Sequence, residues 1–124
     1  PAWVWEKSMD IRGDALLKIE DLRNAGVKNP LDTEVIFSVP EGKPGVRMFV
    51  QQYLPELEDL LGVGFARIED GEAPEGKLVG IEVRDTREVY ARCERSWKRR
   101  PDVGSDHKFP DLSARDAAVM TIIT

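Results

Sequence analysis

With 124 residues, the chain is long enough for one domain that buries roughly two-thirds of its extended-chain surface and needs no disulfide or metal to fold. Its 41% hydrophobic and 33% charged residues are typical of a water-soluble globular protein, and no apolar run approaches the roughly 20 residues of a membrane span. There is no signal-peptide pattern and the single cysteine cannot form an internal disulfide, so we expect a cytoplasmic protein.

The charge is distributed unevenly along the chain. The net charge of −5 argues against nucleic-acid binding by the molecule as a whole. Residues 55–75 carry seven acids against one arginine, whereas residues 87–100 carry six basic side chains against two acids. This asymmetry predicts a positive end that attracts phosphate, although a solvated basic surface without a ligand explains it equally well.

Residues 5–25 are predicted to form a helix, because apolar side chains recur on one face and Gly26 and Pro30 follow. That face consists of Ile11, Ala15, Ile19 and Leu22. Trp3 and Trp5 either packed on a preceding domain or are buried under this helix.

The β-branched run at residues 33–39 predicts a strand, which a proline- and glycine-rich loop at residues 40–45 closes. A second apolar face predicts a helix from residue 46 to residue 61. Its members are Val46, Phe49, Val50, Tyr53, Leu57, Leu60 and Leu61. Pro55 lacks an amide hydrogen, so we expect it to kink this helix or to start a new one.

Three further strands are expected. An acidic loop at residues 69–76 joins an extended segment at residues 63–68 to another at residues 78–84, which predicts antiparallel neighbours. Residues 88–92 are a further candidate strand. Residues 112–120 predict a short closing helix, with Ser113 as its N-cap and Asp116 as a capping-box-like partner.

These elements predict an α+β domain with a small mixed sheet of three to four strands and two main helices packed on one face. The strands at residues 33–39 and 63–68 are joined through a helix, which favours a parallel pair.

No catalytic set is apparent. A pair formed by Cys93 and His107 is conceivable, but His107 stands in a polar loop context, and the paired carboxylates are explained by solvation. Phosphate-cradling glycine motifs are absent. We therefore expect no catalytic residues and no cofactor.

The C-terminal part has the spacing of a four-cysteine zinc ribbon that has lost most of its ligands. Its four ligand positions are Cys93, Ser96, Ser113 and Asp116, arranged as two pairs separated by sixteen residues. Serine hydroxyls are poor zinc ligands, so the sequence predicts a degenerate, metal-free tail. Packing of the apolar residues is expected to replace the metal, and the candidates are Trp97, Val103, Phe109 and Leu112.

An aromatic residue stands among cations between the two ligand pairs. Such a surface stacks an unpaired base on the ring while the cations meet phosphates. The predicted RNA-binding residues are Arg95, Trp97, Lys98, Arg99 and Arg100. The alternative is that Trp97 belongs to the core and the cations face solvent. A third possibility is that Trp97 is buried while Lys98, Arg99 and Arg100 contact phosphate.

The chain resembles the C-terminal zinc-binding region of isoleucyl-tRNA synthetases. The residues that carry the resemblance are Cys93-Glu94-Arg95-Ser96-Trp97, Asp102-Val103-Gly104, Leu112-Ser113-Ala114-Arg115-Asp116 and, upstream, Arg23-Asn24-Ala25-Gly26-Val27. The resemblance implies a parent enzyme that joins isoleucine to its tRNA using ATP, with this region holding the anticodon stem-loop. It also implies that residues 1–30 continue an upstream helical region, residues 31–92 form the α+β core and residues 93–124 are the degenerate ribbon.

The synthetase signatures His-Ile-Gly-His and Lys-Met-Ser-Lys-Ser are absent, so the isolated chain is expected to be catalytically inert. The missing initiator methionine leads us to expect that the chain was cut from a longer protein, whose remainder would be its partner. The alternative function is a structural or protein-interaction module whose RNA role has decayed.

Overall fold

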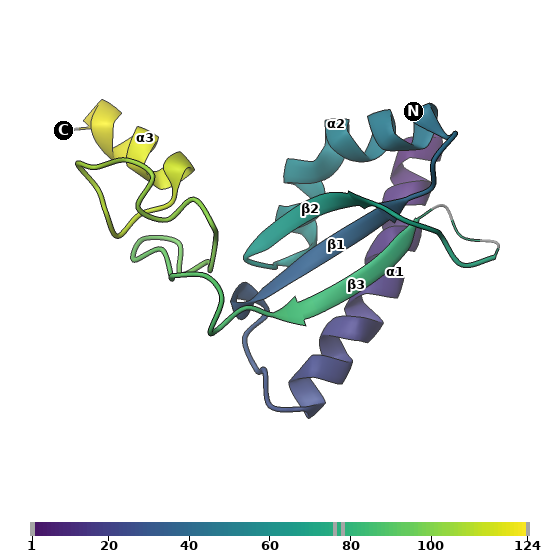
Figure 1. Ribbon diagram of the computed structural model, residues 1–124, viewed down its shortest axis with the longest axis horizontal. Coiled ribbons are helices and arrows are strands. Elements are labelled where there is room, and N and C mark those ends of the chain that lie inside the picture. The colour runs from purple at the N-terminus through teal and green to yellow at the C-terminus, as the bar shows by residue number, and fades with distance from the viewer. Residues whose placement is uncertain (1, 76, 78, 124) are drawn as a thin grey trace.

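The computed structural model describes residues 2–75, 77 and 79–123, with the side chains of residues 2–9 and 123 left out. Its elements are α1 (Ala2–Asn24), a 3-10 turn (Pro30–Asp32), β1 (Thr33–Val39), α2 (Pro44–Leu61), β2 (Phe65–Asp70), β3 (Gly80–Asp85) and α3 (Ala114–Ile123). Figure 1 shows α1 and α2 beside the sheet and α3 in a separate lobe. The predicted α+β class is confirmed. None of the described helices is long and apolar enough to cross a membrane.

The sheet has the order β2-β1-β3, with β1 parallel to β2 and antiparallel to β3. The predicted parallel pair is confirmed, but the expectation that β2 and β3 are neighbours is wrong. Six of the seven residues of β1 are buried, so this strand takes the centre of the sheet and pairs on both edges. The connecting loop passes the end of β1, where Gly71 N donates to Val39 O at 3.2 Å.

The core lies between one face of the sheet and the two long helices. Val35, Phe37 and Val39 of β1 point to this face and are at most 1% exposed. The helices contribute Ile11, Ala15 and Ile19 from α1 and Phe49, Val50, Leu57 and Leu61 from α2. The predicted apolar faces are thereby confirmed, except that Leu60 is exposed and that Leu22, Val46 and Tyr53 are half-buried. The side chains of Trp3 and Trp5 lie outside the described residues.

Helix α2 continues through Pro55 without interruption, so no new helix begins there. It starts at Pro44, inside the segment predicted as loop, because proline is well suited to the first position of a helix. It ends at Gly62, whose positive φ of 71° lets its amide bond back to Glu58 and Asp59.

The predicted strand at residues 88–92 does not form. The chain turns after β3, with Tyr90 N donating to Thr86 O at 3.1 Å and Thr86 Oγ1 donating to Asp32 O at 2.7 Å. Tyr90 then donates its hydroxyl to Glu34 on the second face of the sheet at 2.7 Å. These bonds leave a single bridge between Arg92 and Arg99 in place of a ladder.

Candidate nucleic-acid interface

The four degenerate zinc positions come together in the C-terminal lobe, which we define as residues 93–123. The thiol of Cys93 donates to Asp116 Oδ2 at 3.1 Å, and Ser113 Oγ donates to the same oxygen at 3.0 Å. Ser96 interacts with both Cys93 and Asp116. Arg95 Nη1 donates to the other carboxylate oxygen at 2.8 Å. We call these five residues the Asp116 cluster.

The Asp116 cluster does not fit zinc. It offers one thiol, one carboxylate and two hydroxyls, and the carboxylate oxygens already accept hydrogen bonds from their neighbours. Arg95 brings a positive charge to the carboxylate that a metal would otherwise neutralise. Among the residues that the structure describes, no group of three or more His, Cys, Asp or Glu side chains is arranged to hold a metal ion.

Polar contacts, rather than the expected apolar packing, fill the centre of the lobe. Trp97 is 57% exposed, and Val103, Phe109 and Leu112 are only half-buried. The buried side chains are Cys93, Ser113, Asp116 and Ala117. Ser113 is confirmed as the residue before α3, and its hydroxyl lies 3.5 Å from Asp116 N. The centre of the lobe is therefore a hydrogen-bonded polar cluster, which the apolar content of the sequence did not reveal.

The convergence of these positions predicts the effect of restoring the ligands. Ser96→Cys, Ser113→Cys and Asp116→Cys together should create a tetrahedral zinc site, because all four thiolates would surround one point. One equivalent of zinc in elemental analysis, and a melting temperature that EDTA lowers, would support this. The unsubstituted chain should show neither, and a triple variant that binds neither zinc nor cobalt would contradict the expectation.

Trp97 is held outward by a tight turn. Its amide donates to Cys93 O at 2.8 Å, and Cys93 N donates to Lys98 O at 2.8 Å. The turn places Trp97 at φ 65°, a region where side chains other than glycine are strained by about 1–3 kcal/mol. The guanidinium of Arg92 lies 5.8 Å from the ring centroid. The alternative in which Trp97 belongs to the core is therefore wrong.

The three consecutive cations after Trp97 are committed to ion pairs. Lys98 Nζ lies 3.0 Å from Glu58 and Arg99 Nε lies 2.8 Å from Asp32. Arg100 also pairs with Glu58. The side chains of the three cations are 15–19% exposed. They join the lobe to the core, so the alternative of solvent-facing cations does not describe them either.

A signal for this pairing was present in the sequence. The acidic stretch at residues 55–75 and the basic stretch at residues 87–100 have opposite charge. In the folded chain Glu58 and Asp59 from the first meet Lys98 and Arg100 from the second.

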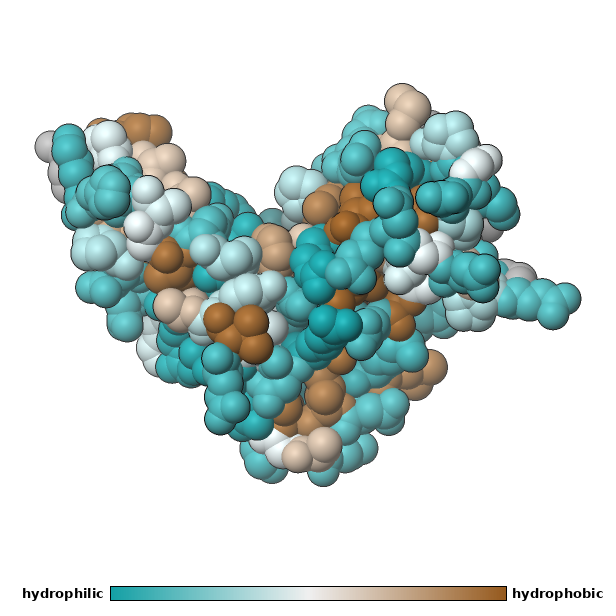
Figure 2. All heavy atoms as spheres, in the orientation of Figure 1, coloured by the Kyte–Doolittle hydropathy of each residue, from teal (hydrophilic) through white to brown (hydrophobic). Residues whose placement is uncertain are grey.

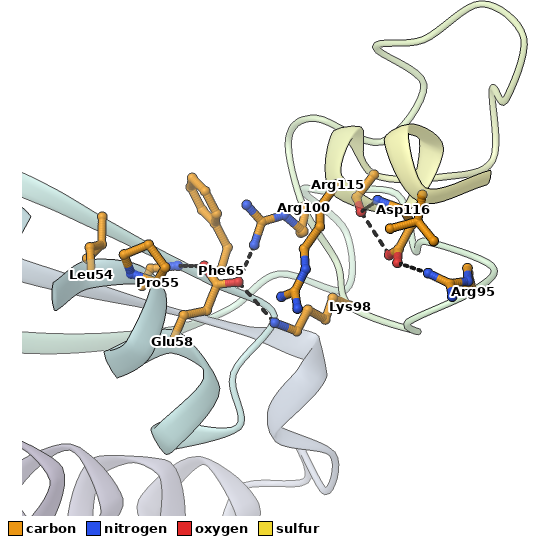
Figure 3. A pocket seen from close by; sticks show the side chains of 12 residues that line it. Leu54, Pro55, Glu58, Phe65, Arg95, Lys98, Arg100, Arg115 and Asp116 are labelled. Atoms are coloured by element: carbon orange, nitrogen blue, oxygen red, sulfur yellow. Dashed lines mark hydrogen bonds and ion pairs between the residues drawn. The ribbon is translucent and has the colours of Figure 1, made fainter. Parts of the chain in front are cut away.

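A cleft of about 500 Å³ lies between α2 and the C-terminal lobe. Figure 2 shows the surface hollowed between these two parts, and Figure 3 shows the side chains that line the cleft. The charged ones are Glu58, Arg95, Lys98, Arg100, Arg115 and Asp116. Three of the five predicted RNA-binding residues therefore line one cleft, whereas Trp97 and Arg99 lie outside its lining. Arg115 was not predicted, although it stands in the second ligand pair as Arg95 stands in the first.

No protein-family model matches the chain. Individual proteins do match, among them three that are named isoleucine–tRNA ligase. The chain is 44% identical over 61 residues to the ligase of Mesorhizobium japonicum, a match that covers 43% of the chain and 6% of that enzyme. It is 32% identical over 112 residues to the ligase of Ralstonia pickettii, a match that covers 90% of the chain and 11% of that enzyme. It is 29% identical over 118 residues to the ligase of Thermotoga petrophila, a match that covers 94% of the chain and 12% of that enzyme. The chain is thus homologous to a segment of isoleucine–tRNA ligases that makes up a small part of those enzymes.

Proposed function

We propose that this chain is the non-catalytic C-terminal region of a cytoplasmic isoleucine–tRNA ligase and that it contacts the anticodon stem-loop of the tRNA. The parent enzyme would join isoleucine to that tRNA using ATP. Homology to ligase segments over 94% of the chain supports the assignment to such an enzyme. The spacing of the four degenerate zinc positions, which meet in the Asp116 cluster, supports the assignment to its zinc-binding end.

One observation carries the RNA contact. Trp97 is a large aromatic side chain held 57% exposed by a strained backbone, with the cation of Arg92 against its ring. A fold that only needed stability would bury this ring or place glycine in the turn. An exposed ring beside cations provides a stacking platform for an unpaired base. Among the predicted RNA-binding cations, Arg95 lies two residues from Trp97 in the sequence, and its side chain is 44% exposed to solvent.

Lys98, Arg99 and Arg100 support a second candidate. Because their charges are engaged by Glu58 and Asp32, they can act as structural links between core and lobe, as a structural or protein-interaction module would require. In the RNA-binding proposal they contribute residual positive potential rather than three independent phosphate contacts.

Substituting Trp97 distinguishes these functions. Trp97→Gly should weaken binding of isoleucine tRNA by about 1–3 kcal/mol, because a stacked base loses its platform, while the salt dependence of binding stays the same. Glycine adopts the positive φ without strain, so the melting temperature should not fall. Fluorescence anisotropy with labelled tRNA measures the affinity.

Val89→Ala is the matched control, because Val89 is 67% exposed and was not predicted to contact RNA. It should bind tRNA like the unsubstituted chain. If Trp97→Gly also binds like the unsubstituted chain, with its fold intact, the RNA contact is refuted and the structural module becomes the better account.

A further inference from the structure

The cations that line the cleft between α2 and the C-terminal lobe fall into two groups. All four come from the lobe. Lys98 and Arg100 point toward Glu58 of α2 (Figure 3), whereas Arg95 pairs with Asp116 and Arg115 pairs with Asp59. The two groups differ in how completely their N–H groups are used.

The first group has little capacity left for a ligand. Glu58 Oε1 accepts from both Lys98 and Arg100, and Glu58 Oε2 accepts from Ala66 N at 3.1 Å. Arg100 also donates to Gly64 O at 3.1 Å and to Asp102 at 3.1 Å. An anion could bind here only by displacing a buried carboxylate, and that would leave Ala66 N without its acceptor.

The second group is open. Arg115 is 74% exposed, and its only ion pair among the described residues is with Asp59 at 3.7 Å, beyond hydrogen-bond distance. Asp59 is itself 56% exposed and is shared with Lys98. Exposed pairs of this kind contribute about 0–1 kcal/mol, so an incoming anion would displace Asp59 at little cost. Within the part of the chain that the structure describes, the guanidinium of Arg95 donates to Asp116 alone.

The position of Arg115 in α3 also indicates that its charge is available to a ligand. It lies in the first turn of α3, where the helix dipole disfavours a cation. It therefore does not stabilise the helix by its charge. From this position its side chain reaches across the cleft toward α2 (Figure 3).

We propose that Arg115 and Arg95 bind the phosphate backbone of RNA at the mouth of this cleft, as contacts separate from the Trp97 stacking platform. The proposal rests on the proposed function of the chain as an RNA-binding region. Guanidinium groups bind phosphate through paired N–H donors, and two of them at one cleft would fix the path of the strand.

Arg115→Gln is the direct test, because an exposed side chain can be replaced without disturbing the fold. Binding of isoleucine tRNA should weaken, and the slope of log affinity against log salt should fall by about 0.7–0.9 for the lost phosphate contact. The melting temperature should be unchanged. Arg115→Lys keeps the charge and should retain the slope.

Arg23→Gln is the matched control, since Arg23 in α1 is also exposed and forms an ion pair with Glu20 at 3.6 Å. It should leave the slope unchanged. An equal loss in Arg23→Gln and Arg115→Gln would overturn the proposal in favour of a general charge effect. An unchanged slope in Arg115→Gln would overturn it too, and if Trp97→Gly still weakened binding, the proposed function would stand without the cleft. A chain that does not bind tRNA at all would refute both.

Discussion

Replacing Glu58 with alanine should lower the free energy of unfolding by about 3–5 kcal/mol, as expected when one partner of a buried ion pair is removed. Glu58 is 8% exposed and accepts hydrogen bonds from Lys98, Arg100 and Ala66 N. The substitution removes the acceptor that two cations and a buried amide share, and leaves Lys98 with the exposed Asp59 and Arg100 with Asp102 and Gly64 O. Urea unfolding followed by circular dichroism measures the loss.

Asp59→Ala provides the control for Glu58→Ala. Asp59 is adjacent in the sequence and also pairs with Lys98, at 3.2 Å, but it is 56% exposed. Its substitution should cost less than about 1 kcal/mol, since water screens exposed pairs. Hydrogen exchange adds a local measure, because the amide of Arg99, bonded to Leu31 O at 3.1 Å, should lose protection in Glu58→Ala. Equal unfolding midpoints for the two variants would mean that these ion pairs do not join the lobe to the core.

Asp116→Asn should destabilise the C-terminal lobe by about 1.5–3 kcal/mol, because hydrogen bonds to a charged acceptor are lost. An amide can accept from Cys93 and Ser113 through its oxygen. Its NH2 group would then face the N–H donors of Arg95. Comparing urea midpoints at neutral pH measures the effect.

The cost of Asp116→Asn should depend on pH. Burial raises the pKa of Asp116, but the hydrogen bonds from Cys93, Ser113, Ser96 and Arg95 outweigh it and hold the pKa below its ordinary value. The carboxylate therefore stabilises the folded chain fully above the unfolded pKa of about 3.9, and this contribution is lost as the pH falls through the lower folded pKa. The difference in melting temperature between wild type and Asp116→Asn should shrink below about pH 4. A difference that stays constant to lower pH would show that Asp116 is not held as a carboxylate.

Local patterns in the sequence determined most of the elements. The apolar spacing of Ile11, Ala15 and Ile19 predicted the buried face of α1, and the β-branched run of β1 predicted a strand with the bounds it has in the structure. The residue types at Ser113 and Asp116 predicted the start of α3. These features depend on residues that are neighbours in the sequence, within one helical turn or one strand. The sequence therefore contains the information needed to predict them.

The tertiary structure alone decided the strand order and the character of the candidate site. The local sequence of β3 does not show whether it pairs with β2 or with β1. Its partner depends on which strand takes the centre of the sheet and pairs on both sides. The partners of the cations were decided in the same way: Lys98 meets Glu58, a residue 40 positions away, only because the lobe docks beside α2. That docking leaves Lys98, Arg99 and Arg100 half-buried and Arg115 open at the mouth of the cleft. The exposure of a side chain and its ion-pair partners depend on how distant segments pack together, so residue type and spacing do not predict them.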